Sequence, residues 1–214
     1  MNSKDFRSSP KLLRNEYPVS QVAEMPIIQQ ETLPNIKSML SFHEVCQNDH
    51  RAKETQLLVH FFKNDNRFES LYGRPYSRNA IEKLKQLAQY TAVCTPDFSL
   101  YPEMPRPVAE KQVFKNRWCG AHWQAQGLCV FPTITWSDKS SYGYCFDGVP
   151  RYSVVVISTL GCSRFKLQFL AGYEKMLEIL QPKTIICYGD PFEEMRNGNI
   201  ISFPYTAFDK GVSA

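Results

Sequence analysis

The sequence predicts an α/β fold, with a mostly parallel sheet of about five strands flanked by helices. Three observations support this prediction. Short runs of β-branched and aromatic residues recur without polar alternation, which is typical of strands buried on both faces. Amphipathic helical segments separate the runs, and proline and glycine turn signals bound them. Strands that alternate with helices indicate β-α-β crossovers in a parallel sheet.

The expected elements follow one another along the chain. The predicted strands begin near Leu57, Ala92, Leu128, Ser153 and Thr184, and residues 199–204 form a candidate sixth strand. The predicted helices cover residues 77–89, 108–127 and 165–180. An open sheet with helices on both faces is the first expectation. A partial or small β/α barrel of the same units is the alternative, because a linear pattern does not separate the two.

The chain divides into one α/β domain, residues 41–205, with an extension at each end. Residues 1–40 read as an extended arm, since prolines at positions 10, 18, 26 and 34 prevent a long helix. Residues 206–214 read as a C-terminal tail. The polar, aperiodic stretch from residue 1 to about residue 11 is expected to be dispensable for folding.

Composition excludes several classes of protein. The 214 residues carry a formal charge of +4, which permits contact with nucleic acid but does not by itself predict it. The seven cysteines form no CxxC pair, so we expect free thiols in a reducing cytoplasm. The four histidines show no ligand spacing, and we therefore expect neither a metal site nor a cofactor. No apolar run is long enough to cross a bilayer, so no membrane partner is expected.

Polar residues follow the predicted strands at the ends where parallel sheets bind ligands. Asp97 opens a proline-rich loop and is the candidate catalytic residue, either as a general base or as a hydrogen-bond acceptor. The candidate binding residues are the other polar, aromatic or glycine positions near these ends: Ser99, Arg117, Trp136, Ser158, Thr159, Gly161 and Arg164. We expect Asp97, Ser99, Arg117, Trp136 and Ser158 to face one cavity, with Asp97 reaching Arg117 or Ser99 directly or through water.

Each candidate also has a structural explanation. Asp97 can instead cap a turn, because a carboxylate accepts hydrogen bonds from nearby backbone N–H groups. Asp65 is either a second carboxylate beside Asp97 or a solvated loop acid. Arg117 either reaches over the sheet or extends its charge to solvent. Trp136 either stacks on a ligand or packs in the core, and Arg164 precedes a helix start that can favour an anion.

Six stretches between Phe42 and Gly189 resemble the family called domain of unknown function 4417, which occurs in bacteria, phages and other mobile elements. The matching stretches are VHFFKNDNRFE, CTPDFSLYPEMP, NRWCGAHWQAQGLCVFPTITW, YCFDGVP, VVVISTLGC and PKTIICYG. The resemblance implies that certain residues occupy family motif positions, namely Asp97, Ser99, Arg117, Trp136, Phe146, Gly148, Pro150, Ser158 and Gly161. It implies no reaction, and the arm and the tail lie outside these stretches.

Three functions remain open at this point. The first is a phage-type protein with a ligand site at the strand ends, which takes a nucleotide-like or phosphorylated small molecule. The second is a nucleic-acid-binding accessory protein of a mobile element. The third is a protein that binds or inhibits a host protein without catalysis. The sequence contains no complete catalytic signature, so whether the chain is an enzyme stays open.

Overall fold

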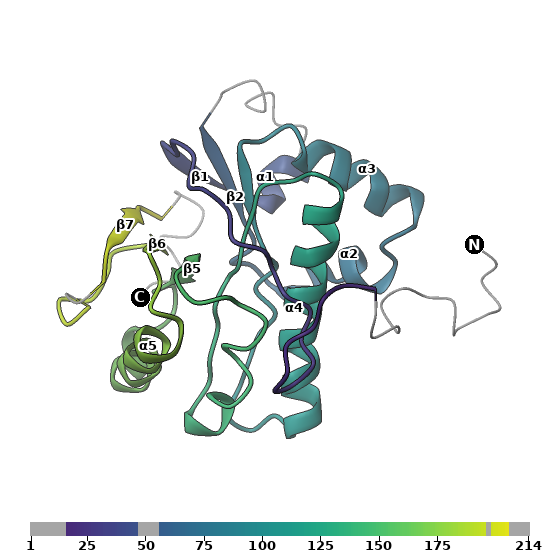
Figure 1. The fold of residues 1–214 in the computed structure, drawn as a ribbon. Helices are drawn as coiled ribbons and strands as arrows, with labels where there is room; N and C mark the ends of the chain where they lie inside the picture. The colour runs from purple at the N-terminus through teal and green to yellow at the C-terminus, as the bar shows by residue number, and fades with distance from the viewer. Residues whose placement is uncertain (1–15, 47–55, 196–197, 206–214) are drawn as a thin grey trace.

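The computed structural model describes residues 16–46, 56–195 and 198–205, and within these ranges it is an α/β structure (Figure 1). The strands are β1 Ser38–Ser41, β2 Leu57–His60, β3 Ala92–Cys94, β4 Val130–Phe131, β5 Val154–Ser158, β6 Thr184–Tyr188 and β7 Ile200–Phe203. The α-helices are α1 Phe42–Cys46, α2 Glu69–Gly73, α3 Arg78–Leu87, α4 Arg106–Ala125 and α5 Lys166–Leu180. Short 3-10 turns are η4 Asp65–Arg67, η5 Lys139–Ser141 and η6 Ser163–Phe165.

Local sequence explains where the helices begin and end. Ser77 caps α3, because its side chain accepts a hydrogen bond from the N–H of Ala80. α4 has Pro107 in its first turn, where a missing N–H costs nothing. Gly127 follows α4 with a φ of +86°, a conformation that suits glycine just beyond a helix. The predicted helices are thereby confirmed, with shifts of one or two residues at most of their ends.

All paired strands are parallel, which confirms the predicted class. β1–β2–β3–β4 and β5–β6–β7 form two ladders, and a parallel bridge between Thr133 and Val156 joins them. The expectation of a single uninterrupted sheet was therefore too simple. Pro132 follows β4 and lacks the N–H that a longer ladder would need, although its carbonyl accepts from Val156 at 2.9 Å. β7 confirms the candidate sixth strand at one edge, and β1 adds an unexpected strand at the other.

The strands follow one another in chain order across both ladders, and the sheet curves strongly. His60 in β2 lies 4.1 Å from Tyr188 in β6, measured between ring centroids. Three strands separate them in the ladder, so a flat sheet would place them about 19 Å apart. The curvature supports the partial-barrel alternative. His60 and Tyr188 face its concave side.

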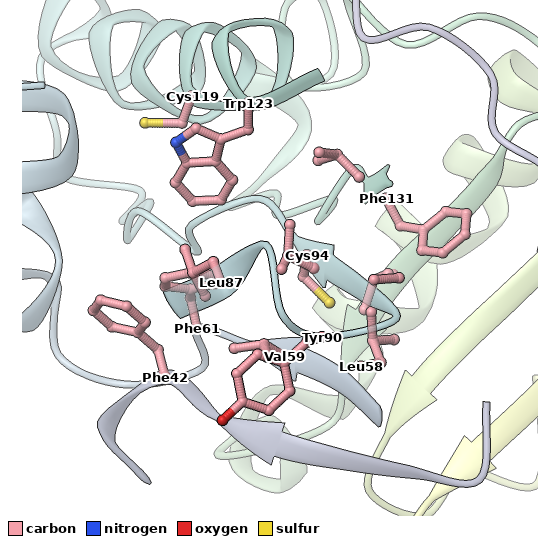
Figure 2. Packing of buried hydrophobic residues seen from close by; sticks show 14 of the residues in the cluster. Phe42, Leu58, Val59, Phe61, Leu87, Tyr90, Cys94, Cys119, Trp123 and Phe131 are labelled. Atoms are coloured by element: carbon pink, nitrogen blue, oxygen red, sulfur yellow. The ribbon is translucent and has the colours of Figure 1, made fainter. Parts of the chain in front are cut away.

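The helices cover the convex face. Phe61, next to His60 and on the opposite face of the strand, stacks on Phe42 of α1 at 4.7 Å and lies 5.5 Å from Trp123 of α4. Figure 2 shows Trp123 pointing from α4 toward the sheet. Further along the same face, α5 packs through Tyr173 in a second cluster with the β5 and β6 side chains. The expectation of helices on both faces was wrong, because sequential strand order with one crossover hand puts them on one side.

The described part of the arm crosses α4 and binds to it. Tyr17 Oη and His122 Nδ1 are 2.9 Å apart, and the buried Ile28 packs against Gly120. The N–H of Ile28 donates to the carbonyl of Gly148 at 3.0 Å. Not every apolar side chain of the arm packs on the domain, because Val22 is exposed. The expectations for residues 1–11 and for the tail, residues 206–214, lie outside the described residues.

Candidate functional site

Three neighbouring strand ends supply a row of polar side chains at the carboxyl end of the sheet. We call Asp97 after β3, Thr135 after β4 and Ser158 at the end of β5 the strand-end row. Thr135 Oγ1 donates a short hydrogen bond to Asp97 Oδ1. Thr133 pairs with Val156, so Thr135 and Ser158, each two residues further along, lie level with each other. The row therefore spans β3, β4 and β5.

Asp97 is a half-buried carboxyl with an unusual titration. Its pKa is raised to about 6: burial is the main cause, the hydrogen bond from Thr135 opposes the shift, and the negative charge of Asp65 adds to it. Within the described ranges, Thr135 is the side chain that hydrogen-bonds this carboxyl, and it does so at Oδ1. The carboxyl can therefore both accept a hydrogen bond through Oδ2 and exchange a proton near neutral pH.

Asp65 lies beside Asp97 and fixes the loop that carries it. Ser99 donates its backbone N–H and its hydroxyl to the Asp65 carboxylate, with Oγ to Oδ1 at 2.9 Å. Gln112 Nε2 in α4 donates to the same carboxylate at 3.1 Å. The charge of Asp65 also acts on the pKa of Asp97. The structure thus brings the two carboxylates together. Ser99 holds the loop in place by donating hydrogen bonds to Asp65.

A buried lysine in α4, which the sequence did not single out, supports the same region. Lys115 Nζ lies 2.5 Å from Glu69 Oε2 and 2.9 Å from Gln112 Oε1. It also lies 3.9 Å from the centroid of the Phe98 ring, a cation–π distance. Polar residues three positions apart on a helix usually indicate a solvated face, so the sequence held no signal for this burial.

Arg117 is a structural residue, and it does not pair with Asp97. Its Nε donates to the carbonyl of Asp147 at 2.8 Å, and its Nη2 donates to that of Cys145 at 2.7 Å. Its Nη1 donates to Asn116 Oδ1 at 2.5 Å. Burial lowers the pKa of Arg117 to about 10, so it stays protonated at neutral pH. The direct Asp97–Arg117 contact that the sequence allowed does not form, because backbone carbonyls and Asn116 accept the hydrogen bonds of the guanidinium.

Trp136 packs in the core region over α5. Its ring centroid lies 5.0 Å from that of Phe169 and 6.2 Å from that of Phe146. Gly172 leaves the space that the indole occupies, since a Cβ there would lie 2.1 Å from Trp136 Nε1. Of the two readings of Trp136, packing is the one that these contacts support.

The loop after β5 contains the remaining candidates. Ser158 Oγ donates to the carbonyl of Tyr188 at 3.0 Å, and Thr159 Oγ1 donates to that of Asp190 at 3.0 Å. Both hydroxyls therefore tie β5 to β6. Gly161 has a φ of +73°, with open space where a Cβ would stand. Arg164 is exposed, and it makes no ion pair or side-chain hydrogen bond with the rest of the described chain.

Cys162 connects this loop to the strand-end row. Its Sγ donates to the carbonyl of Ser158 at 3.7 Å. Burial raises the pKa of the thiol to about 11, and the negative charge of Asp97 contributes. Asp97 and the β5 loop are therefore neighbours. At this pKa the thiol is protonated at neutral pH and is not an activated nucleophile.

A small half-open cavity lies between α4 and the ends of β3 and β4. Its polar lining includes Gln112, Asn116, Arg117 and Thr135. Its volume is about 10 Å³, which is room for about one water molecule. Of the five side chains expected to face one cavity, Arg117 alone lines this one. The expected shared cavity is therefore not this one.

Three further observations concern metal ligands, cysteines and membrane spans in the described chain. Across its three ranges, no group of three or more His, Cys, Asp or Glu residues is arranged to hold a metal ion. All seven cysteines fall inside these ranges, and each is a free thiol, as the sequence predicted. In the same ranges, no helix has both the length and the apolarity that a membrane span requires.

Known proteins similar to the chain come from mycobacteriophages. The chain is 35% identical over 181 residues to the Gene 1 protein of Mycobacterium phage D29. The aligned region covers 83% of this chain and 64% of that protein. It is 37% identical over 144 residues to the Gene 1 protein of Mycobacterium phage L5, covering 66% of this chain and 60% of that protein. The chain thus spans less than two thirds of the length of either relative. No solved structure matches it.

The family assignment rests on a match that covers most of the chain. The family model described as Domain of unknown function (DUF4417) matches residues 17–206. The match begins within the arm, so the arm residues from 17 onward belong to the family domain, although the sequence motifs had left them outside. The mycobacteriophage relatives are consistent with a phage family. The chain belongs to the DUF4417 family of domains of unknown function.

Proposed function

We propose that this phage-type protein binds a small nucleotide-like ligand at the carboxyl ends of β3, β4 and β5. The observation that carries the proposal is the strand-end row, which has Asp97 at its β3 end. Asp97 Oδ1 accepts a hydrogen bond from the Thr135 hydroxyl, and the pKa of the Asp97 carboxyl is raised to about 6. A carboxylate in that setting accepts hydrogen bonds from ligand hydroxyls, such as those of a ribose.

The β5 loop supplies a candidate contact for the phosphate end of such a ligand. Cys162 neighbours Asp97, and Arg164 follows two residues later with its guanidinium exposed. Two residues span at most about 7 Å, so Arg164 stays close to the strand-end row. Arg164 suits an anion because a guanidinium offers paired donors to phosphate oxygens. The β5 loop also provides Gly161, whose surroundings are open.

The cavity beside α4 is too small for the proposed ligand. Room for about one water does not accommodate a nucleotide. We therefore infer that the ligand lies on the open rim above the strand-end row, and that ordered water occupies the cavity. Ser158 and Thr159 donate to backbone carbonyls, so they meet the ligand only as acceptors.

Calorimetric titration with the four ribonucleoside 5′-monophosphates at pH 7.5 tests the proposal, because Asp97 is ionised at that pH. We expect Asp97→Asn to weaken binding by about tenfold or more, since a hydrogen bond to a charged acceptor contributes about 1.5–3 kcal/mol. Arg164→Ala should weaken binding as well. Glu174→Gln and Arg74→Ala are matched controls, because both side chains are exposed and lie outside the row.

Unchanged affinity in Asp97→Asn, or no binding of any of the four nucleotides, would contradict the proposal.

The nucleic-acid alternative is tested in parallel by a salt-dependent DNA titration. The described ranges contain equal numbers of basic and acidic residues, so the formal charge of +4 comes from the rest of the chain. This balance favours a small ligand over nucleic acid as the partner of the described part of the chain. A pull-down from host lysate addresses the host-protein alternative.

A further inference from the structure

The connection between β5 and α5 exposes a large aromatic ring beside the proposed site. Phe165, the last residue of η6, is 66% exposed and directly follows Arg164. Isolated exposed apolar residues are common on protein surfaces and usually need no explanation. Phe165 differs in its position, because it belongs to the loop that carries Gly161 and Cys162 next to Asp97.

A series of hydrogen bonds fixes the backbone that presents this ring. The N–H of Cys162 donates to the carbonyl of Thr159 at 3.1 Å, and the N–H of Phe165 donates to that of Cys162 at 3.0 Å. Thr159 in turn donates through Oγ1 to the carbonyl of Asp190. Phe165 is thereby held relative to the ends of β5 and β6. A ring on an ordered backbone loses little conformational freedom when a flat ligand stacks on it.

We propose that Phe165 is the stacking platform for the base of the ligand, an inference that rests on the nucleotide-like ligand proposed above. Asp97 then contacts the ribose, Arg164 the phosphate, and Phe165 the base. Every nucleobase has a π-face, so a platform of this kind tolerates all four bases. The site would therefore discriminate nucleotides from sugar phosphates and would distinguish the four bases only weakly.

The test compares adenosine 5′-monophosphate with ribose 5-phosphate, which lacks the base. Affinities are measured by calorimetry for the unmodified chain and for Phe165→Ala, Phe165→Trp and Leu167→Ala. Leu167 is the matched control, because it is 85% exposed and lies two residues further, in the first turn of α5. All three substitutions are at exposed positions, so the variants are expected to fold, and circular dichroism checks that they do.

The platform predicts that the unmodified chain binds adenosine 5′-monophosphate at least about tenfold more tightly than ribose 5-phosphate, as expected for loss of one stacked base. Phe165→Ala should remove that difference, while Phe165→Trp and Leu167→Ala should retain it. Equal affinities for the two probes in the unmodified chain, or a Phe165→Ala variant that binds like the parent, would overturn the platform and leave the ribose-phosphate contacts standing. Failure of both probes to bind would refute the rim site together with the platform.

Discussion

Asp97→Asn should stabilise the protein at pH 8 and have almost no effect on stability at pH 4. The pKa of Asp97 is about 6 in the folded chain and 3.8 in its ordinary setting. The folded state thus binds the proton more tightly than the unfolded state does. As pH rises from about 4 to about 6, the unfolded state loses the proton first, and stability falls. Most of this stability is lost by pH 6, and little more is lost above about pH 7.

The size of the effect follows from the shift in pKa. One pKa unit corresponds to about 1.4 kcal/mol, so a shift from 3.8 to about 6 costs up to about 3 kcal/mol at pH 8. The side chain is half-buried, and solvent screening reduces this figure, so we expect about 1–3 kcal/mol. Asparagine keeps the size of the side chain and an oxygen that accepts from Thr135, while it removes the charge that burial disfavours.

Urea unfolding at pH 4, 6 and 8, followed by tryptophan fluorescence, measures this effect in both proteins. The gain in the free energy of unfolding should appear mainly between pH 4 and 6 and change little above about pH 7. Glu174→Gln, at an exposed position, should show no comparable pH-dependent gain. If Asp97→Asn were less stable than the parent at pH 8, or equally changed at every pH, the buried-charge explanation would be wrong. If Asp97→Asn gains stability and loses ligand affinity, the negative charge of Asp97 is retained for binding at a cost in stability.

Three other substitutions test the contacts around the site by thermal and urea unfolding. Gly172→Ala should cost about 1–3 kcal/mol, because its Cβ would lie 2.1 Å from Trp136 Nε1; an unchanged melting temperature would contradict the packing. Arg117→Met should cost about 3 kcal/mol or more, since it leaves buried carbonyls without donors, and full stability would refute its structural role. Tyr17→Phe should cost about 1 kcal/mol through its hydrogen bond to His122; no loss would mean that this bond does not hold the arm.

Local periodicity determined the class of fold and most of its elements. Apolar runs bounded by turn residues located β2 to β6, and helical spacing with stop signals located α3, α4 and α5. These features depend on neighbours in the chain, so one sequence contains them. The placement of Asp97 at a strand end follows for the same reason, because Thr95-Pro96 interrupts the strand just before it.

The tertiary structure alone decided how the elements curve and which side chains meet. The contact between His60 and Tyr188 depends on strand order and on twist summed over the four steps from β2 to β6, and no local pattern encodes it. Arg117 and Trp136 had two readings each, and both side chains meet distant partners: backbone carbonyls accept from the guanidinium, and Phe169 of α5 packs against the indole. Asp97 met Thr135, 38 residues away, because two parallel strands end side by side. Pairings of this kind depend on long-range packing, which residue type and spacing do not specify.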